Sequence, residues 1–452
     1  MPDVTPVRLA STEAPAPPSE PIVRPAPERI SQPAPLPLSL FDAIETSLQQ
    51  NPDLVALRRN EGVSLGLLGV ARTYPFNPYV QIQATPGQWN PGGVGPGTIY
   101  HYVLVMQTVQ LAHQQRYRTA NALAALTSVR WNILQAELVN VAQTERLYFT
   151  ALYQRGIRDL TRASAELNNQ LLDVGEKQLR AGQVSAADVA IVRLDAQSTR
   201  RQSQLAEANY RTAELDLRRQ LALPLELPLD LNGSLADFRW SSAEPQRLAQ
   251  VKCAGSTTLV SSDSQAVISD LVAGRPDVLA ARADVAAARA NVDWAQALRV
   301  PDLQIGPYYQ RTETSTTYVG FRAQSDIPII NNGVPLVRQR VAESRQRQVV
   351  WEQLHTRALI EAQTAIDRYE RALRLASEPV SGDLPKELQA LEEEFKSQEV
   401  DIVRIFTART SLIQARRAQL DLLNELAQAA ANVTQATAVA PQHLVRPADV
   451  AE

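Results

Sequence analysis

An internal repeat is the feature that most limits how this 452-residue chain can fold. The segment Asn51-Pro-Asp-Leu-Val-Ala-Leu-Arg58 matches Arg275-Pro-Asp-Val-Leu-Ala-Ala-Arg282, and Pro78-Tyr-Val-Gln-Ile82 matches Pro301-Asp-Leu-Gln-Ile305. The first match is separated by 224 positions and the second by 223. Because this distance is far longer than a solenoid unit, we expect one fold unit to be used twice.

Each unit is expected to begin with a helix and continue into a β-hairpin. The helices start with Pro in the first turn and Asp beside it, where the missing N–H costs nothing and the helix dipole favours an acid. After about 20 residues the apolar period changes from 3.6 to 2, which predicts strands. The expected strands are 79–85 and 99–111 in the first unit, and 303–311 and 317–327 in the second.

A very long helical hairpin is expected to follow each β-hairpin, over 113–223 and 335–437. The tract from His113 to Gly182 contains no proline and would be roughly 100 Å long at ~1.5 Å per residue. Ser185-Ala-Ala-Asp188 is typical of a capping box that opens the returning helix, so the first tip falls at 181–185. Pro379 and Pro385 predict a break in the second hairpin.

The remaining segments are expected to be irregular. Residues 1–37 hold 11 of the 29 prolines and are predicted to be a disordered lead without signal-peptide character. Residues 232–264 are predicted to link the two repeats, which span 38–231 and 265–437, and 438–452 are predicted to be a flexible tail.

Composition excludes several classes of function. The 45 Lys and Arg balance 48 Asp and Glu, which argues against nucleic-acid binding. Cys253 is the only cysteine, so no disulfide framework or cysteine-rich metal centre can form. The four histidines are scattered, and no nucleophile lies beside a base in a recognisable motif. We therefore expect no enzyme activity, no cofactor and no metal site.

Aromatic residues are concentrated in the expected hairpins and allow two interpretations. They reflect either ordinary β-propensity or a girdle at a membrane interface. The candidate girdle consists of Tyr79, Trp89, Tyr100, Tyr102, Tyr308, Tyr309, Tyr318 and Phe321.

Four strands cannot close a barrel, so a membrane location would require an oligomer. Two chains would give about eight strands, whose interior is filled by side chains, and three would give about twelve, which leave a channel. If the assembly is a conduit, the number of strands needed for a channel favours a trimer.

Over about 38–437 the chain resembles the TolC-type outer-membrane efflux proteins. The resemblance rests on the order of the duplicated motifs together with Ala280–Arg289, Ser325-Asp-Ile-Pro-Ile329 and Gly182-Gln-Val-Ser-Ala-Ala-Asp188. It implies a mainly α fold with a small β part: a homotrimer with a 12-stranded β-barrel in the outer membrane and an α-helical barrel in the periplasm.

The resemblance also implies a function and partners. The protein would be the passive exit duct of a tripartite efflux or type I secretion system that exports small molecules such as drugs or metal ions. Its partners would be outer-membrane lipid, a periplasmic adaptor protein and an inner-membrane pump of the resistance-nodulation-division or ABC type. The signal peptide that such a bacterial outer-membrane protein needs is not present in this chain.

The hairpin tips would contact the adaptor. The first tip matches the family pattern, whereas the second has Gln398 in place of the usual glycine. The expected contact residues are Gly182, Gln183, Val184, Ser185, Asp188, Gln398, Glu399, Val400 and Asp401.

The expected periplasmic gate consists of Asp188, Asp401, Arg404 and Thr407. Acidic positions of some family members correspond to Arg404 and Thr407, so an acidic ring is not expected at those two positions. We expect Arg404 to pair with Asp188 of a neighbouring hairpin.

A periplasmic coiled-coil adaptor or scaffold is the alternative interpretation, since such proteins use the same heptads. Adaptors usually have one hairpin per chain and lack the duplication. The strands distinguish the two, because in a barrel every second residue faces lipid.

Overall fold

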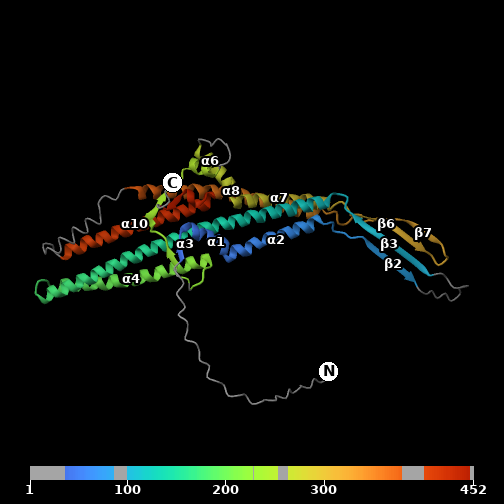
Figure 1. Ribbon diagram of the computed structural model, residues 1–452. Helices are drawn as coiled ribbons and strands as arrows, with labels where there is room; N and C mark the ends of the chain where they lie inside the picture. Colours follow the sequence, from blue (N-terminus) through green and yellow to red (C-terminus); the bar gives the residue numbers. More distant parts are fainter. Residues whose placement is uncertain are drawn as a thin grey trace, which may run out of the picture.

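The computed structural model describes residues 36–85, 99–225, 227, 229–252, 263–378 and 402–447, with side chains at all of them except 36 and 402–409. The body is elongated, with a β-sheet at one end and the turn between two long helices at the other (Figure 1). Within those ranges, no helix combines the length and the apolar character that crossing a membrane requires.

The short helices that open each repeat begin at side-chain and proline signals. Helix α1 (Leu40–Gln50) starts with a capping box between Ser39 and Asp42. Helix α2 (Pro52–Arg72) is capped by Asn51, whose side chain accepts from two backbone N–H groups. Helix α7 (Pro276–Ala297) is its counterpart in the second repeat and also has Pro in its first turn.

Four long helices make up the body. They are α3 (Gln114–Arg180), α4 (Ala186–Leu221), α8 (Val334–Ser377) and α10 (Ile402–Thr437). Helix α3 packs against α2, α4, α7 and α10, and α8 packs against α7 and α10. The end of α8 at Ser377 falls just before the Pro379 that predicts a break.

A four-stranded antiparallel sheet carries the order β2-β3-β6-β7. Its strands are β2 (Tyr79–Thr85), β3 (Tyr100–Val109), β6 (Leu303–Arg311) and β7 (Thr317–Ser325). Each repeat contributes one hairpin, and β3 pairs with β6 to join the two. Among the described residues, strands β2 and β7 are therefore the two edges of the sheet.

In the predicted linker 232–264, the described residues up to 252 are a folded part of the body, whereas 253–262 lie outside the described residues. It contains the 3-10 helix η1 (Leu235–Asp237) and the strand β5 (Phe238–Trp240), followed by α5 (Pro245–Lys252) and α6 (Ser264–Ala273). Phe238 packs edge-on against Phe149 of α3, with 5.2 Å between ring centroids. These apolar side chains supply the burial that a free linker lacks.

Both predicted irregular ends need correction. The tail forms η2 (Pro441–His443) and β8 (Val445–Pro447), and β8 pairs antiparallel with β5. Leu444 and Val445 are fully buried, so residues 438–447 are packed rather than flexible. At the other end, β1 (Leu36–Leu38) pairs in parallel with β4 (Leu229–Leu231), so ordered structure begins inside the predicted lead.

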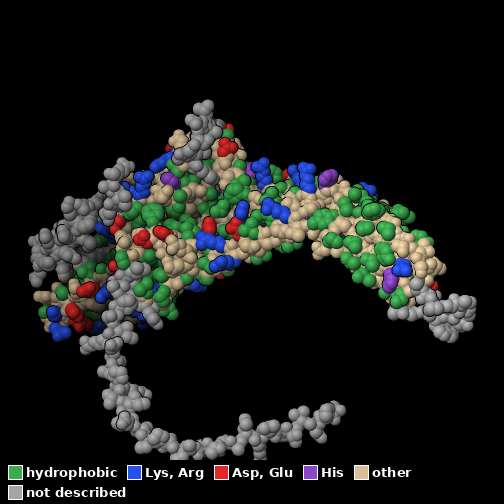
Figure 2. Space-filling view, turned by 45° about the vertical axis from the view of Figure 1, so that its right-hand side comes forward, with side chains coloured by type: hydrophobic (Ala, Val, Ile, Leu, Met, Phe, Trp, Pro, Cys, Tyr) green, Lys and Arg blue, Asp and Glu red, His purple; other side chains and the backbone are tan. Residues whose placement is uncertain are grey.

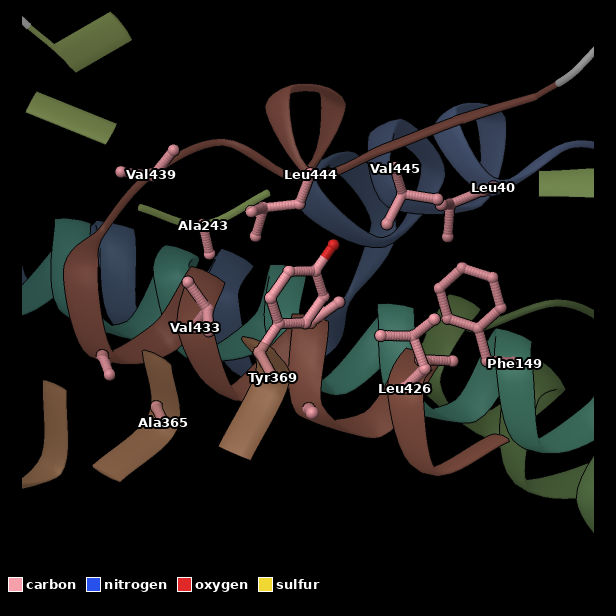
Figure 3. Packing of buried hydrophobic residues seen from close by; sticks show 14 of the residues in the cluster. Leu40, Phe149, Ala243, Ala365, Tyr369, Leu426, Val433, Val439, Leu444 and Val445 are labelled. Carbon is pink, nitrogen blue, oxygen red and sulfur yellow. The ribbon is translucent and has the colours of Figure 1, made fainter. Parts of the chain in front are cut away.

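The core lies in this middle region, where the short elements cover the long helices. Figure 3 shows the Tyr369 ring of α8 beside Leu426 and Val433 of α10, with Leu444 and Val445 above it. The Tyr369 hydroxyl donates to the Ser241 carbonyl oxygen at 2.7 Å. This hydrogen bond fastens the segment between the repeats to the second long hairpin.

Candidate functional site

The two faces of the β-sheet differ sharply in chemistry. Directly paired residues of neighbouring strands share a face, so the register assigns every side chain to one of the two. One face, here called the apolar face, includes Val80, Ile82, Val103, Val105, Val109, Ile305, Tyr309, Val319 and Phe321. The opposite one, here called the polar face, includes Gln81, Gln83, Gln304, Gln310 and Gln324.

Burial of these side chains is the reverse of what a water-soluble sheet shows. On the apolar face Phe321 is 81% exposed, Val319 78% and Ile82 73%. On the polar face Leu104 and Met106 are completely buried. Figure 2 shows hydrophobic side chains gathered over the sheet end of the molecule, while most of the charged ones lie over the helices. A contiguous exposed apolar surface of this kind marks contact with another protein or with lipid.

The predicted aromatic girdle is divided by the register. Tyr309 and Phe321 lie on the apolar face. The other strand tyrosines lie on the polar face among the glutamines: Tyr79, Tyr100, Tyr102, Tyr308 and Tyr318. These residues therefore do not form one belt on a common surface, and Trp89 lies outside the described residues. The cause is the side-chain period of two, which sends neighbouring Tyr308 and Tyr309 to opposite faces.

The first hairpin tip is a tight turn between α3 and α4. Gly182 has a φ of +72°, and the Gln183 N–H donates to the Gln178 carbonyl oxygen at 2.9 Å. This is a Schellman ending, which favours glycine in the left-handed conformation. Ser185 then caps α4: its hydroxyl accepts from the Asp188 N–H at 3.2 Å and donates to the Asp188 carboxylate at 2.6 Å.

The tip residues are presented to solvent at the far end from the sheet. Gly182, Gln183 and Ser185 are exposed, while Val184 and Asp188 are half-buried. The apolar seam between α3 and α4 begins just inside the tip, at Gly175 and Val189. The turn thus offers a polar surface with a hydrophobic contact directly behind it.

The second tip was predicted at Gln398–Asp401, and these residues lie outside the described part of the chain. Arg404 and Thr407 fall within α10, but their side chains are not described. Of the four gate residues predicted from the sequence, the structure therefore describes only the side chain of Asp188. Its carboxylate accepts a hydrogen bond from the Ser185 hydroxyl of the same turn.

Two apolar stripes on the helices are left exposed by the described part of the chain. One runs along α2 at Val63, Leu67 and Val70, which are spaced to share a helix face. The other runs along α4 and consists of Ile191, Leu194, Leu205 and Leu215. No trio of His, Cys, Asp or Glu in the described ranges is arranged to hold a metal ion.

Comparison with known proteins shows which fold the chain has. No protein-family model matches the chain, and no curated protein matches it in sequence. Solved structures match over nearly their whole length. The outer-membrane channel OprN has a TM-score of 0.66 at 16% identity, with 89% of this chain and 90% of that chain covered. The Campylobacter jejuni CmeC outer membrane channel has 0.67 at 13%, covering 91% and 87%.

The open state of the Neisseria gonorrhoeae MtrE outer membrane channel gives a TM-score of 0.63 at 17% identity, with 88% of each chain covered. The chain therefore has the mainly α fold of TolC-type outer-membrane efflux channels. At these identities the likeness establishes the architecture alone.

Proposed function

We propose that this protein is the outer-membrane exit duct of a tripartite efflux or secretion system, and that it exports small molecules such as drugs or metal ions from the periplasm. The observation that carries the proposal is the sheet with an exposed apolar face and a glutamine-rich polar face. In a membrane barrel with a water-filled interior the outward side chains are apolar and the inward ones polar. The sheet of this chain has that division.

A homotrimer follows from the open edges of the sheet. Unpaired N–H and C=O groups on β2 and β7 cannot be left in hydrocarbon, where each costs several kcal/mol. Pairing β7 of one chain with β2 of the next satisfies both edges, and three chains give about the dozen strands that leave a channel. The exposed stripes on α2 and α4 support the same assembly, because neighbouring chains would cover them.

The tips would bind the periplasmic adaptor, through which an inner-membrane pump supplies the free energy. The exposed polar turn at Gly182–Ser185 supports this role, since it lies at the end of the body opposite the sheet (Figure 1). In the closed duct we propose that Arg404 pairs with Asp188 of a neighbouring hairpin. If so, Arg404→Glu increases leak conductance and adding Asp188→Arg restores closure; a double variant that still leaks would disprove the pairing.

Lysine substitutions on alternate residues of β7 test the membrane barrel. We expect Val319→Lys and Phe321→Lys to impair assembly in outer membranes, because a lysine facing lipid at midplane costs about 2–4 kcal/mol. The matched controls Tyr318→Lys and Gln324→Lys place the same charge on the polar face and should assemble normally. If all four variants assemble equally well, the sheet does not face lipid and the proposed function as a duct is wrong.

A further inference from the structure

The polar face of the sheet carries one formal charge. Strands β2, β3, β6 and β7 contain no Asp, Glu or Lys, and their two arginines are Arg311 and Arg322. The register places Arg311 opposite His101 on the apolar face, near the end of the sheet far from the helices. It places Arg322 on the polar face, among the glutamines and tyrosines. The side chain of Arg322 is exposed.

The surroundings of Arg322 allow its side chain to extend across the sheet. Its partner in β6 is Gly306, where an added Cβ would collide with the Val105 carbonyl group of β3. The guanidinium extends over β6 to β3, where Nη1 donates to the Tyr102 hydroxyl oxygen at 3.4 Å. Nη2 donates to Gln324 Oε1 at 3.4 Å.

These partners are neutral, so they position the guanidinium without cancelling its charge. Within the described ranges no carboxylate forms an ion pair with Arg322. The Tyr102 ring is itself supported by Tyr308, with 6.2 Å between ring centroids. Tyr308 pairs with Gly320 of β7, where an added Cβ would lie 2.9 Å from the tyrosine ring. Gly320 of β7 thus makes room for the Tyr308 ring, and the guanidinium of Arg322 lies beside this aromatic pair.

We propose that Arg322 determines charge selectivity in the β-part of the duct, favouring anionic and neutral solutes over cations. This inference rests on the proposed function, in which the polar face lines the lumen. Three copies of Arg322 would then form a ring of positive charge in a wall whose strands offer no acid. Rings of arginine or lysine favour anions in pores, and a fixed field raises the local concentration of counter-ions. Within the cargo range proposed above, this segment would pass anionic and neutral small molecules more readily than metal cations.

The test is the reversal potential of the full-length protein in planar lipid bilayers across a KCl gradient. Low ionic strength is essential, since the Debye length is ~30 Å at 0.01 M salt and only ~10 Å at 0.1 M. We expect wild-type channels to prefer chloride. Arg322→Gln should lower the chloride-to-potassium permeability ratio by about two- to threefold, because a potential of about one kT changes ion concentrations by that factor. Arg322→Glu should move the ratio further toward potassium.

Two controls separate this effect from general loss of charge or misfolding. Arg322→Lys keeps the charge and should keep the chloride preference. Arg311→Gln removes the same charge from the apolar face and should leave the ratio unchanged. An Arg311→Gln effect as large as that of Arg322→Gln, or wild-type channels that prefer potassium, would overturn the proposal. Wild-type protein that forms no channel would instead contradict the duct itself.

Discussion

Asn51 and Arg275 occupy equivalent positions in the two repeats, and each donates a hydrogen bond to the last turn of the helix that closes its own repeat. Asn51 Nδ2 donates to the Gln220 carbonyl oxygen of α4 at 3.1 Å. Arg275 Nη1 donates to the Ala436 carbonyl oxygen of α10 at 3.2 Å. Helices α2 and α7 are therefore joined to the final helix of their repeats, α4 and α10, at equivalent points by different chemistry.

The two positions should differ in their contribution to stability. Arg275 is 4% exposed and also binds the Asp277 carboxylate at 2.7 Å, so Arg275→Ala leaves a partly buried acid without its ion pair and the Ala436 carbonyl oxygen without this hydrogen bond. We expect a loss of about 3 kcal/mol or more in the free energy of unfolding. Asn51→Ala removes a helix cap and should cost about 1 kcal/mol. Denaturant unfolding in detergent measures both.

Arg219→Ala is the matched control for this pair. Its guanidinium is largely exposed and contacts Asp216 at 3.4 Å on the helix surface, so its removal should change stability by less than about 1 kcal/mol. Equal losses for Arg275→Ala and Arg219→Ala would show that the buried arginine does not join α7 to α10.

Glu145 predicts a pH dependence of stability. This residue of α3 is fully buried, and its burial raises the pKa of the carboxyl group to about 8. Around it lie Thr434 of α10, Tyr369 of α8 and neighbouring Arg146, whose Nη2 donates to Asn432 Oδ1 at 2.8 Å. The folded protein therefore binds a proton that the unfolded chain releases at a lower pH.

This difference in bound protons between the folded and unfolded states decides how stability changes with pH. Between the ordinary glutamate pKa of 4.5 and about 8 the folded state holds more protons, so stability falls as the pH rises through that window. Glu145→Gln keeps the shape, removes the ionisation and should be more stable than wild type at pH above 8. Thermal unfolding followed across this pH range tests it. The control Glu207→Gln, at an exposed pair with Arg211, should keep the wild-type slope.

Helix and strand positions in both repeats could be predicted because their signals are local. Proline in the first turn of α2 and α7, and the serine cap at Ser185, act through neighbouring backbone groups. The segments 232–252 and 438–447 could not be predicted in this way. Val445 is buried because β8 pairs with β5 about 200 residues earlier in the chain, and nothing in the local sequence encodes that contact.

The sequence also did not predict which side chains lie on which face of the sheet. In β3 the run Val103-Leu-Val-Met106 is apolar at every position, so alternation does not say which side is outward. The register with β2 and β6 separates Val103 and Val105 from Leu104 and Met106, and in doing so moves most of the tyrosines to the polar face.

Alanine substitutions at two glycines near the first tip, Gly182 and Gly175, are expected to change local stability in opposite directions. Gly182 has a positive φ and no atom within 4 Å of an added Cβ, so Gly182→Ala is penalised by its backbone conformation alone. We expect about 1 kcal/mol of local destabilisation, seen as faster hydrogen exchange of amides at 178–189. Gly175→Ala, inside α3, meets only Val189 at 3.8 Å and should slow exchange there, since alanine favours helix. Faster exchange in both variants would contradict this account of the turn.

Disulfide cross-linking across the open edges tests how the chains assemble. In a Cys253→Ser background, a cysteine at Ile82 of β2 is combined in turn with cysteines at Tyr318, Val319, Gly320 and Phe321 of β7. Paired residues on one face have Cβ atoms about 4.5–5.5 Å apart, within reach of a disulfide after small shifts. We therefore expect cross-linked trimers only when both cysteines lie on the apolar face, at Val319 or Phe321. Cross-links confined within single chains would mean that the sheet closes on itself, and equal cross-linking at all four positions would mean that β7 and β2 do not form a registered pair.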